Sequence, residues 1–117
     1  MKQKIDRYLK ILQIELEDLE CDILDAEEAL KKKFKDREIT DYVFMENLAA
    51  FKAELSGIQK MEKEIESLSD KFDDLDSLCS FIDGFVREKV EDANLPEAVY
   101  FLIKRKLDKI YLYTRQI

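Results

Sequence analysis

The sequence of 117 residues contains no histidine, two glycines and one proline. An average chain of this length has about eight glycines and about six prolines. Sandwiches, barrels and α/β folds need many tight turns, so the shortage of turn-forming residues argues against all three. Histidine is the commonest general base and transition-metal ligand. Its absence argues against an enzyme, and we expect no catalytic residue, no metal site and no cofactor.

Cysteine is also scarce, with Cys21 and Cys79 as the two thiols. Disulfide-dependent secreted domains usually carry more, so the count indicates a reducing compartment and a cytoplasmic location. The longest apolar run is Ala98 to Ile103, which predicts neither a signal peptide nor a membrane span. The net charge of −7 repels nucleic acid and anionic lipid, so we expect neither as a partner.

Apolar residues at alternating spacings of four and three mark a long first helix. Such spacing is the heptad seam of a coiled coil, and a helix near 2–35 is stable only if a partner helix covers that seam. The seam consists of Ile5, Leu9, Leu12, Leu16, Leu19, Ile23, Ala26 and Leu30.

A second helix is predicted to begin near Asp41. Thr40 is a good N-cap, and Ile39 and Phe44 occupy the two positions of a hydrophobic staple. A second heptad stripe follows, so this helix can fold back antiparallel on the first as an α-hairpin. Its seam reads Phe44, Leu48, Phe51, Leu55, Ile58, Glu62 and Ile65.

Two features of this second helix are unusual. Glu62 is the one acid on the seam, and we expect Met61 to turn inward while the carboxylate reaches solvent, because unpaired buried charge is costly. Ala50, Ala53 and Gly57 form a flanking strip of small side chains, where another backbone could approach closely.

In the second half the apolar spacing changes phase near Ser67 to Asp70. We predict a break capped by Ser67, Ser69 or Asp70, followed by a third helix. A fourth helix is predicted to begin with Asn94 as N-cap, Pro96 in the first turn and Glu97 completing a capping box.

These patterns predict an all-α fold, an antiparallel four-helix bundle built on a long coiled-coil-like hairpin, as a single helical domain of residues 1–117. The helices are expected near 2–35, 41–68, 70–92 and 95–116. The last two are about ten residues shorter than the first, so the hairpin should project by roughly 15 Å. The alternative is a three-helix fold in which 41–92 form one long helix.

Three surfaces are candidates for partner binding. The first is an acidic ridge on the first helix that contains no lysine or arginine. The second is the hairpin tip, where cations lie beside aromatic and aliphatic side chains. The third is a weaker apolar stripe that either later helices or a second copy of the chain would cover. The ridge comprises Glu15, Glu17, Asp18, Glu20, Asp22, Asp25, Glu27 and Glu28; the tip comprises Lys31, Lys32, Lys33, Phe34, Lys35, Arg37, Ile39 and Tyr42; the stripe comprises Ile11, Ile14, Cys21 and Leu24.

The sequence therefore favours a non-enzymatic helical protein that binds a protein partner through a charged helix face and a projecting hairpin tip, with a homo-oligomer as one form of assembly. The alternative is an acidic inhibitor or nucleic-acid mimic, of the anti-defence kind that phages and mobile elements encode, whose ridge blocks the basic channel of a nucleic-acid enzyme. A third reading, nucleic-acid contact through Lys104, Arg105, Lys106 and Lys109, conflicts with the net charge.

Overall fold

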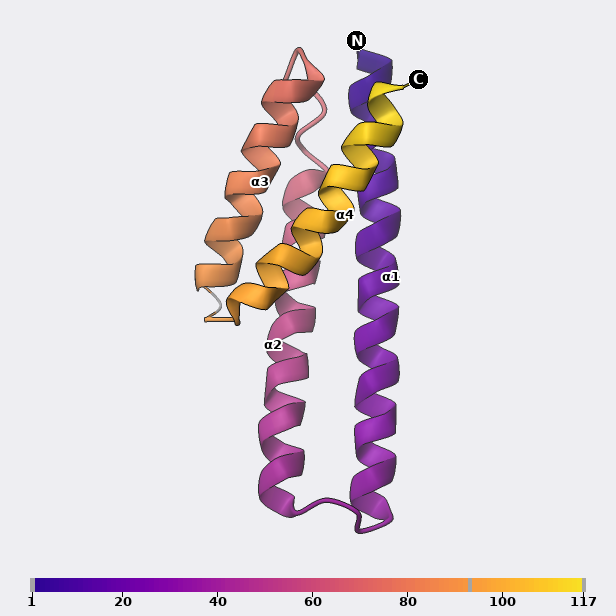
Figure 1. The fold of residues 1–117 in the computed structure, drawn as a ribbon, viewed down its shortest axis with the longest axis vertical. Coiled ribbons are helices and arrows are strands. Elements are labelled where there is room, and N and C mark those ends of the chain that lie inside the picture. Colours follow the sequence, from indigo (N-terminus) through magenta and orange to yellow (C-terminus); the bar gives the residue numbers. More distant parts are fainter. Residues whose placement is uncertain (1, 93, 117) are drawn as a thin grey trace.

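The computed structural model describes residues 2–92 and 94–116, and within them the chain forms four α-helices and no strand. The helices are α1 (Lys2–Lys35), α2 (Asp41–Ile65), α3 (Leu75–Asp92) and α4 (Glu97–Arg115). They alternate in direction along the molecule (Figure 1). This confirms the predicted all-α antiparallel bundle and rules out the alternative in which 41–92 form one helix.

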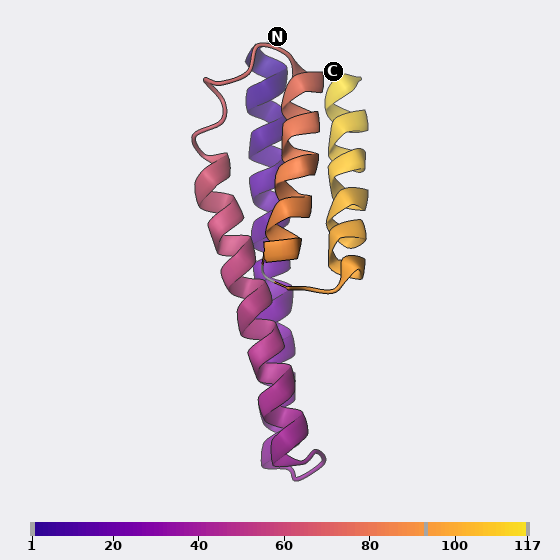
Figure 2. The same cartoon turned by 90° about the vertical axis from the view of Figure 1, so that its left-hand side faces the viewer.

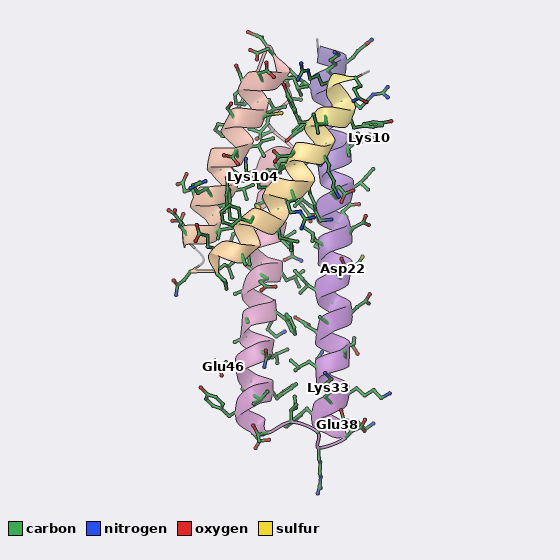
Figure 3. All side chains as sticks on the ribbon, viewed as in Figure 1. Lys10, Asp22, Lys33, Glu38, Glu46 and Lys104 are labelled. Carbon is green, nitrogen blue, oxygen red and sulfur yellow. The ribbon has the colours of Figure 1, made fainter. Side chains whose placement is uncertain are left out.

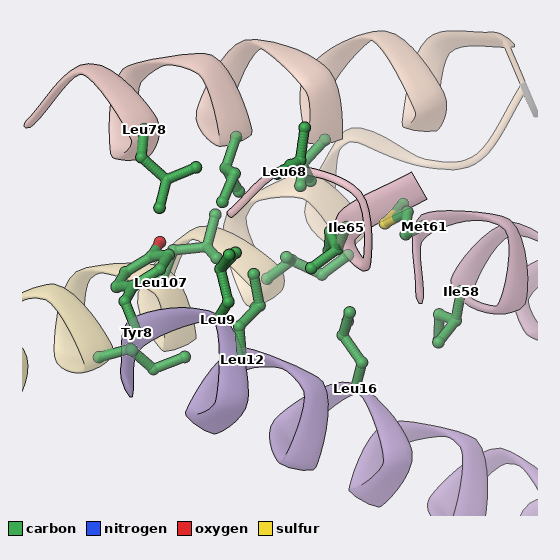
Figure 4. Close-up of a cluster of buried hydrophobic side chains, with 14 of the residues drawn as sticks. Tyr8, Leu9, Leu12, Leu16, Ile58, Met61, Ile65, Leu68, Leu78 and Leu107 are labelled. Carbon is green, nitrogen blue, oxygen red and sulfur yellow. The ribbon is translucent and has the colours of Figure 1, made fainter. Parts of the chain in front are cut away.

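The hydrophobic core (Figure 4) lies in the half of the molecule where α1 begins and α4 ends (Figure 1). Ile5, Leu9, Leu12 and Leu16 of α1 are buried there, against residues of α2, α3 and α4. Each fully buried leucine or isoleucine contributes roughly 1.5–3 kcal/mol relative to exposure. The first half of the α1 heptad seam thus forms one side of the hydrophobic core.

Beyond the core the hairpin continues alone. Between Leu16 and Ile58 no hydrophobic side chain is fully buried, and the seam residues of both helices are half-buried. Leu19 and Ile23 still pack against the core, and farther along the hairpin α1 and α2 pack on each other. We call residues 17–57 the stalk; most of it projects past α3 and α4 in both views (Figures 1 and 2). α1 has 34 residues and α3 has 18, a difference of 16, or about 24 Å of helix. The projection is therefore longer than the expected 15 Å.

The stalk ends in a tight connection with a defined stop and start. Arg37 has a φ of 61°, and its N–H and that of Glu38 donate to the carbonyls of Phe34 and Lys33, which is a Schellman motif. Thr40 Oγ1 then accepts from the Val43 N–H at 3.2 Å, as an N-cap does. The predicted start of the second helix is confirmed.

The connection between α2 and α3 is longer than predicted. α2 ends at Ile65 and α3 begins at Leu75, so the third helix starts five residues later than the expected 70. The cap is Asp74, whose Oδ1 accepts from the Ser77 N–H at 2.8 Å, and not Ser67, Ser69 or Asp70. Leu68 is nevertheless buried and Phe72 packs on the core, so the apolar spacing continued through a segment that is not helical.

The predicted role of Asn94 is also wrong. Asn94 has a φ of 56°, and its N–H and that of Leu95 donate to the carbonyls of Glu91 and Val90. This is a second Schellman motif, so Asn94 terminates α3 and does not cap α4. Pro96 stands at the N-cap position of α4 without a side-chain hydrogen bond, and α4 begins at Glu97.

Candidate interaction surfaces

The hairpin tip presents its cations to solvent. Lys31, Lys32, Lys33, Lys35 and Arg37 are all exposed, and Lys31 pairs weakly with Glu28 at 3.6 Å. Such an exposed pair adds little stability. The segment 31–42 also contains the exposed acids Asp36, Glu38 and Asp41, so five cations and three acids give this end a small positive charge on an otherwise acidic molecule (Figure 3 shows Lys33 and Glu38).

The aromatic side chains of the tip divide into two kinds. Phe34 stacks on Phe44 across the hairpin, with ring centroids 4.2 Å apart, so it closes the end of the seam and is half-buried. Ile39 is also half-buried. Tyr42 is 75% exposed, and the neighbouring Met45 is exposed as well, a residue that the sequence analysis did not single out. The apolar contact area of the tip is therefore centred on Tyr42 and Met45.

The predicted acidic ridge is not one continuous surface. Residues three, four and seven apart share a helix face, so Asp18, Asp22 and Asp25 lie on one face of α1, and Glu17 and Glu20 lie on another. The eight acids also differ in burial, since Glu27 is buried and Glu15 and Glu20 are half-buried.

Glu15 and Glu27 are two of these less exposed acids. Glu15 forms an ion pair with Lys106 of α4, Oε2 to Nζ 3.2 Å, and so ties α1 to α4. Glu27 is 5% exposed, and its Oε1 is buried without a hydrogen-bond partner. Its placement on a solvent-exposed ridge is therefore wrong: it flanks Ile23 and Leu30 on the side that packs toward α2.

Glu62 is less exposed than expected. Met61 is buried, as predicted, but the Glu62 carboxyl group does not reach water fully, because its Oε1 is buried. Burial raises the pKa of Glu62 to about 7, together with a hydrogen bond to Glu20 and the negative charges of Glu20, Glu17 and Glu66. The pair Glu20 and Glu62 is thus an acidic contact between α1 and α2 that favours a bound proton.

The faint apolar stripe on α1 is covered in part. Ile11 packs against the core, whereas Ile14, Cys21 and Leu24 remain exposed on α1. Further apolar side chains are exposed on α4, namely Phe101, Leu102, Leu112 and Tyr113.

A polar network joins α3 to α4. The Tyr100 hydroxyl donates to Asp83 at 2.6 Å and accepts from Arg87 at 3.1 Å, and the Arg87 guanidinium lies over the Tyr100 ring. Lys104 pairs with Asp83 at 3.5 Å. With Lys104 and Lys106 engaged in ion pairs, the basic set on α4 is in part a structural feature of the bundle.

Where the stalk meets the start of α4, the surface contains an apolar groove of about 280 Å³, which we call the front groove. α4 crosses one face of the hairpin in Figure 1. The groove is lined by side chains of α1, α2 and α4, together with Lys89 of α3 and Leu95. Its polar side chains are Asp22, Glu54 and Lys89. Most of its wall is apolar and comes from the hairpin and α4, including Leu19, Ile23, Ala26, Phe51, Gly57, Val99 and Leu102.

The front groove was not predicted as a cavity. The strip of Ala50, Ala53 and Gly57 was the signal for it, because it marked a face where another backbone could come close. In the structure nothing lies within 4 Å of a Cβ built on Gly57. The chain itself therefore leaves this position uncovered.

A comparison of this chain with protein-family models, curated proteins and solved structures finds no match. Among the described residues no helix has the length and hydropathy that crossing a bilayer requires. A group of three or more cysteine, aspartate or glutamate residues placed to hold a metal ion is likewise missing from the described part of the chain.

Proposed function

We propose that this protein is a non-enzymatic binding module, in which the four-helix end fixes the stalk and the stalk contacts a protein partner. The supporting observation is the stalk itself. Its seam residues are half-buried, and its end carries five exposed cations beside the exposed Tyr42 and Met45. Two helices that project alone cover their apolar surface less well than a bundle does, and such surfaces are typical of interaction sites.

Site-specific photo-cross-linking in the native cell tests this proposal. A photoreactive amino acid is placed in the full chain at Tyr42 on the tip, at Ala50 on the stalk, or at Phe81 on α3 as a matched exposed control. We expect a discrete protein adduct from the two stalk positions and none from Phe81. Adducts confined to Phe81, or none at any position, would contradict a binding role for the stalk.

The alternative role, an acidic inhibitor that occupies a basic channel, has weaker support. It needs the acids of α1 to act together, yet Glu27 is buried and Glu15 is paired with Lys106. It predicts salt-sensitive binding to a basic nucleic-acid enzyme that is lost when Glu17, Asp18 and Glu20 become amides. Unchanged binding by that variant would end this alternative.

A further inference from the structure

We infer that the front groove binds a basic amphipathic helix of the partner, an inference that rests on the proposed function of the stalk. α4 already lies on this face of the hairpin, at the end of the molecule that holds the core (Figure 1). Below α4 the same face is bare. A further helix laid there would continue the packing that α4 begins, in the groove between α1 and α2.

The shape of the bare face suits a helix. On α1, Ala26 and Ala29 lie four and seven residues after Asp22; on α2, Ala50 lies four residues before Glu54 and Gly57 three residues after it, so each set shares a helix face. Small side chains on both sides allow a third backbone to approach the hairpin closely. The face from Asp22 to Ala29 is eight residues long, or about 12 Å, which accommodates about two turns of a partner helix and stops short of the exposed Lys33 of the tip.

The charged side chains of the groove indicate which charge the partner helix should carry. Its one cation, Lys89, is already neutralised by Glu64 at 3.1 Å and lies over the Phe85 ring. Asp22 and Glu54 make no ion pair or hydrogen bond in the described part of the chain, and burial raises the pKa of Glu54. Asp18 and Asp25 lie a turn before and after Asp22 on the same face (Figure 3 shows Asp22 near the level where α4 begins).

An apolar wall bordered by unpaired carboxylates fits a helix with large apolar residues on one face and lysine or arginine beside them. An acidic helix would place like charges together, and an uncharged ligand would leave the Glu54 carboxylate partly desolvated without a partner.

A designed probe tests the inference. A fluorescein-labelled 18-residue helical peptide of leucine and lysine, with leucines on one face, is titrated with the full chain and followed by anisotropy; a matched peptide has glutamate in place of every lysine. We expect saturable binding of the lysine peptide that weakens with added salt, and binding of the glutamate peptide at least ten-fold weaker, a difference of about 1.4 kcal/mol.

Two glycine variants distinguish peptide binding in the groove from nonspecific electrostatic binding of a basic peptide to an acidic protein. Gly57→Leu places a side chain in the groove, and Gly84→Leu places the same side chain on the exposed surface of α3; at both positions an added Cβ meets nothing within 4 Å. Both should fold, because leucine favours helix more than glycine does. We expect Gly57→Leu to weaken lysine-peptide binding about ten-fold and Gly84→Leu to leave it unchanged. Replacing Asp22 by Asn together with Glu54 by Gln should weaken binding and flatten its salt dependence.

Equal binding by Gly57→Leu and the unmodified chain would overturn the inference, as would equal binding of the two peptides. A dimer in sedimentation that Gly57→Leu converts to a monomer would assign the groove to a second copy and also overturn it. These outcomes are distinct from those of the photo-cross-linking: adducts at Tyr42 with peptide binding insensitive to Gly57→Leu would leave the proposed function intact and remove the groove from it.

Discussion

At the scale of single residues, Glu62 shows how a carboxyl group on a packed seam changes its chemistry. It faces Glu20 and Glu17 from α1 and Glu66 from its own helix, and its pKa is raised from 4.5 to about 7. Folding therefore favours the protonated form. The stabilising effect of that proton is complete below pH 4.5 and is lost as the pH rises through 7.

We therefore predict that Glu62→Gln is more stable than the unmodified protein at pH 8, by about 1 kcal/mol after allowance for partial solvent screening, and that the difference nearly vanishes at pH 5. Urea unfolding at the two pH values measures it. Glu46→Gln, on the exposed face of α2 (Figure 3), is the control and should show no such dependence. A Glu62→Gln variant equally or less stable at pH 8 would contradict the account of this pair.

The hydroxyl of Tyr100 gives a second prediction at this scale. Tyr100 is buried and its hydroxyl bridges Asp83 and Arg87, so Tyr100→Phe removes one bond to each of two charged groups. We expect a loss of about 1.5–3 kcal/mol in the free energy of unfolding. Tyr111→Phe breaks an exposed hydrogen bond to Asp76 and should cost less. Equal losses from the two variants would show that the Tyr100 network does not hold α3 to α4.

At the scale of helices, the sequence was informative where side chains act locally. The seam of Ile5 to Leu16, the Thr40 cap and the repeat from Phe44 to Ile58 depend on neighbours within a few residues. The first helix and the start of the second were placed correctly, whereas the second helix ends at Ile65 and not at the expected 68. The connections were placed less well. Leu68 and Phe72 keep a helical spacing although they lie in a loop, because the core accepts an apolar side chain from any backbone that reaches it.

The role of Asn94 and the presence of the front groove could not be predicted from the sequence. Asparagine is favoured both as an N-cap and in the left-handed conformation that ends a helix, so residue type alone could not decide between the two. The groove depends on where α4 crosses the hairpin, which is a tertiary property. The strip ending at Gly57 indicated an open face, but nothing local showed that Val99 and Leu102 would form its other side.

The left-handed residue at the end of α1 yields a prediction at the scale of elements. Arg37 adopts a φ of 61°, a conformation that costs a residue with a Cβ roughly 1–2 kcal/mol and costs glycine little. Arg37→Gly should therefore raise the free energy of unfolding by about 1 kcal/mol, and Arg37→Ala, which removes the same charge, should not. Thermal unfolding of the two variants measures this. If they melted together, the Schellman stop of the stalk would be contradicted.

At the scale of the whole molecule, a four-helix end and a two-helix stalk separate stability from binding. The core accounts for the fold at one end, and the other end is free to carry exposed cations and bare apolar side chains. Charge also limits self-association. Antiparallel pairing of two α1 helices about Cys21 would set the acids from Glu15 to Glu28 of one copy against the same acids of the other. We therefore expect a monomer at moderate salt concentrations.

Small-angle X-ray scattering of the full chain over a concentration series tests the projecting stalk most directly, because both binding proposals need it uncovered. The structure has a Cα radius of gyration of 16.5 Å and extents of 54 × 25 × 21 Å. We predict a concentration-independent monomer mass with a radius of gyration near 16.5 Å, allowing for a small hydration increment. A value close to the roughly 13 Å of a compact domain of this length, or the mass of a dimer, would contradict the account.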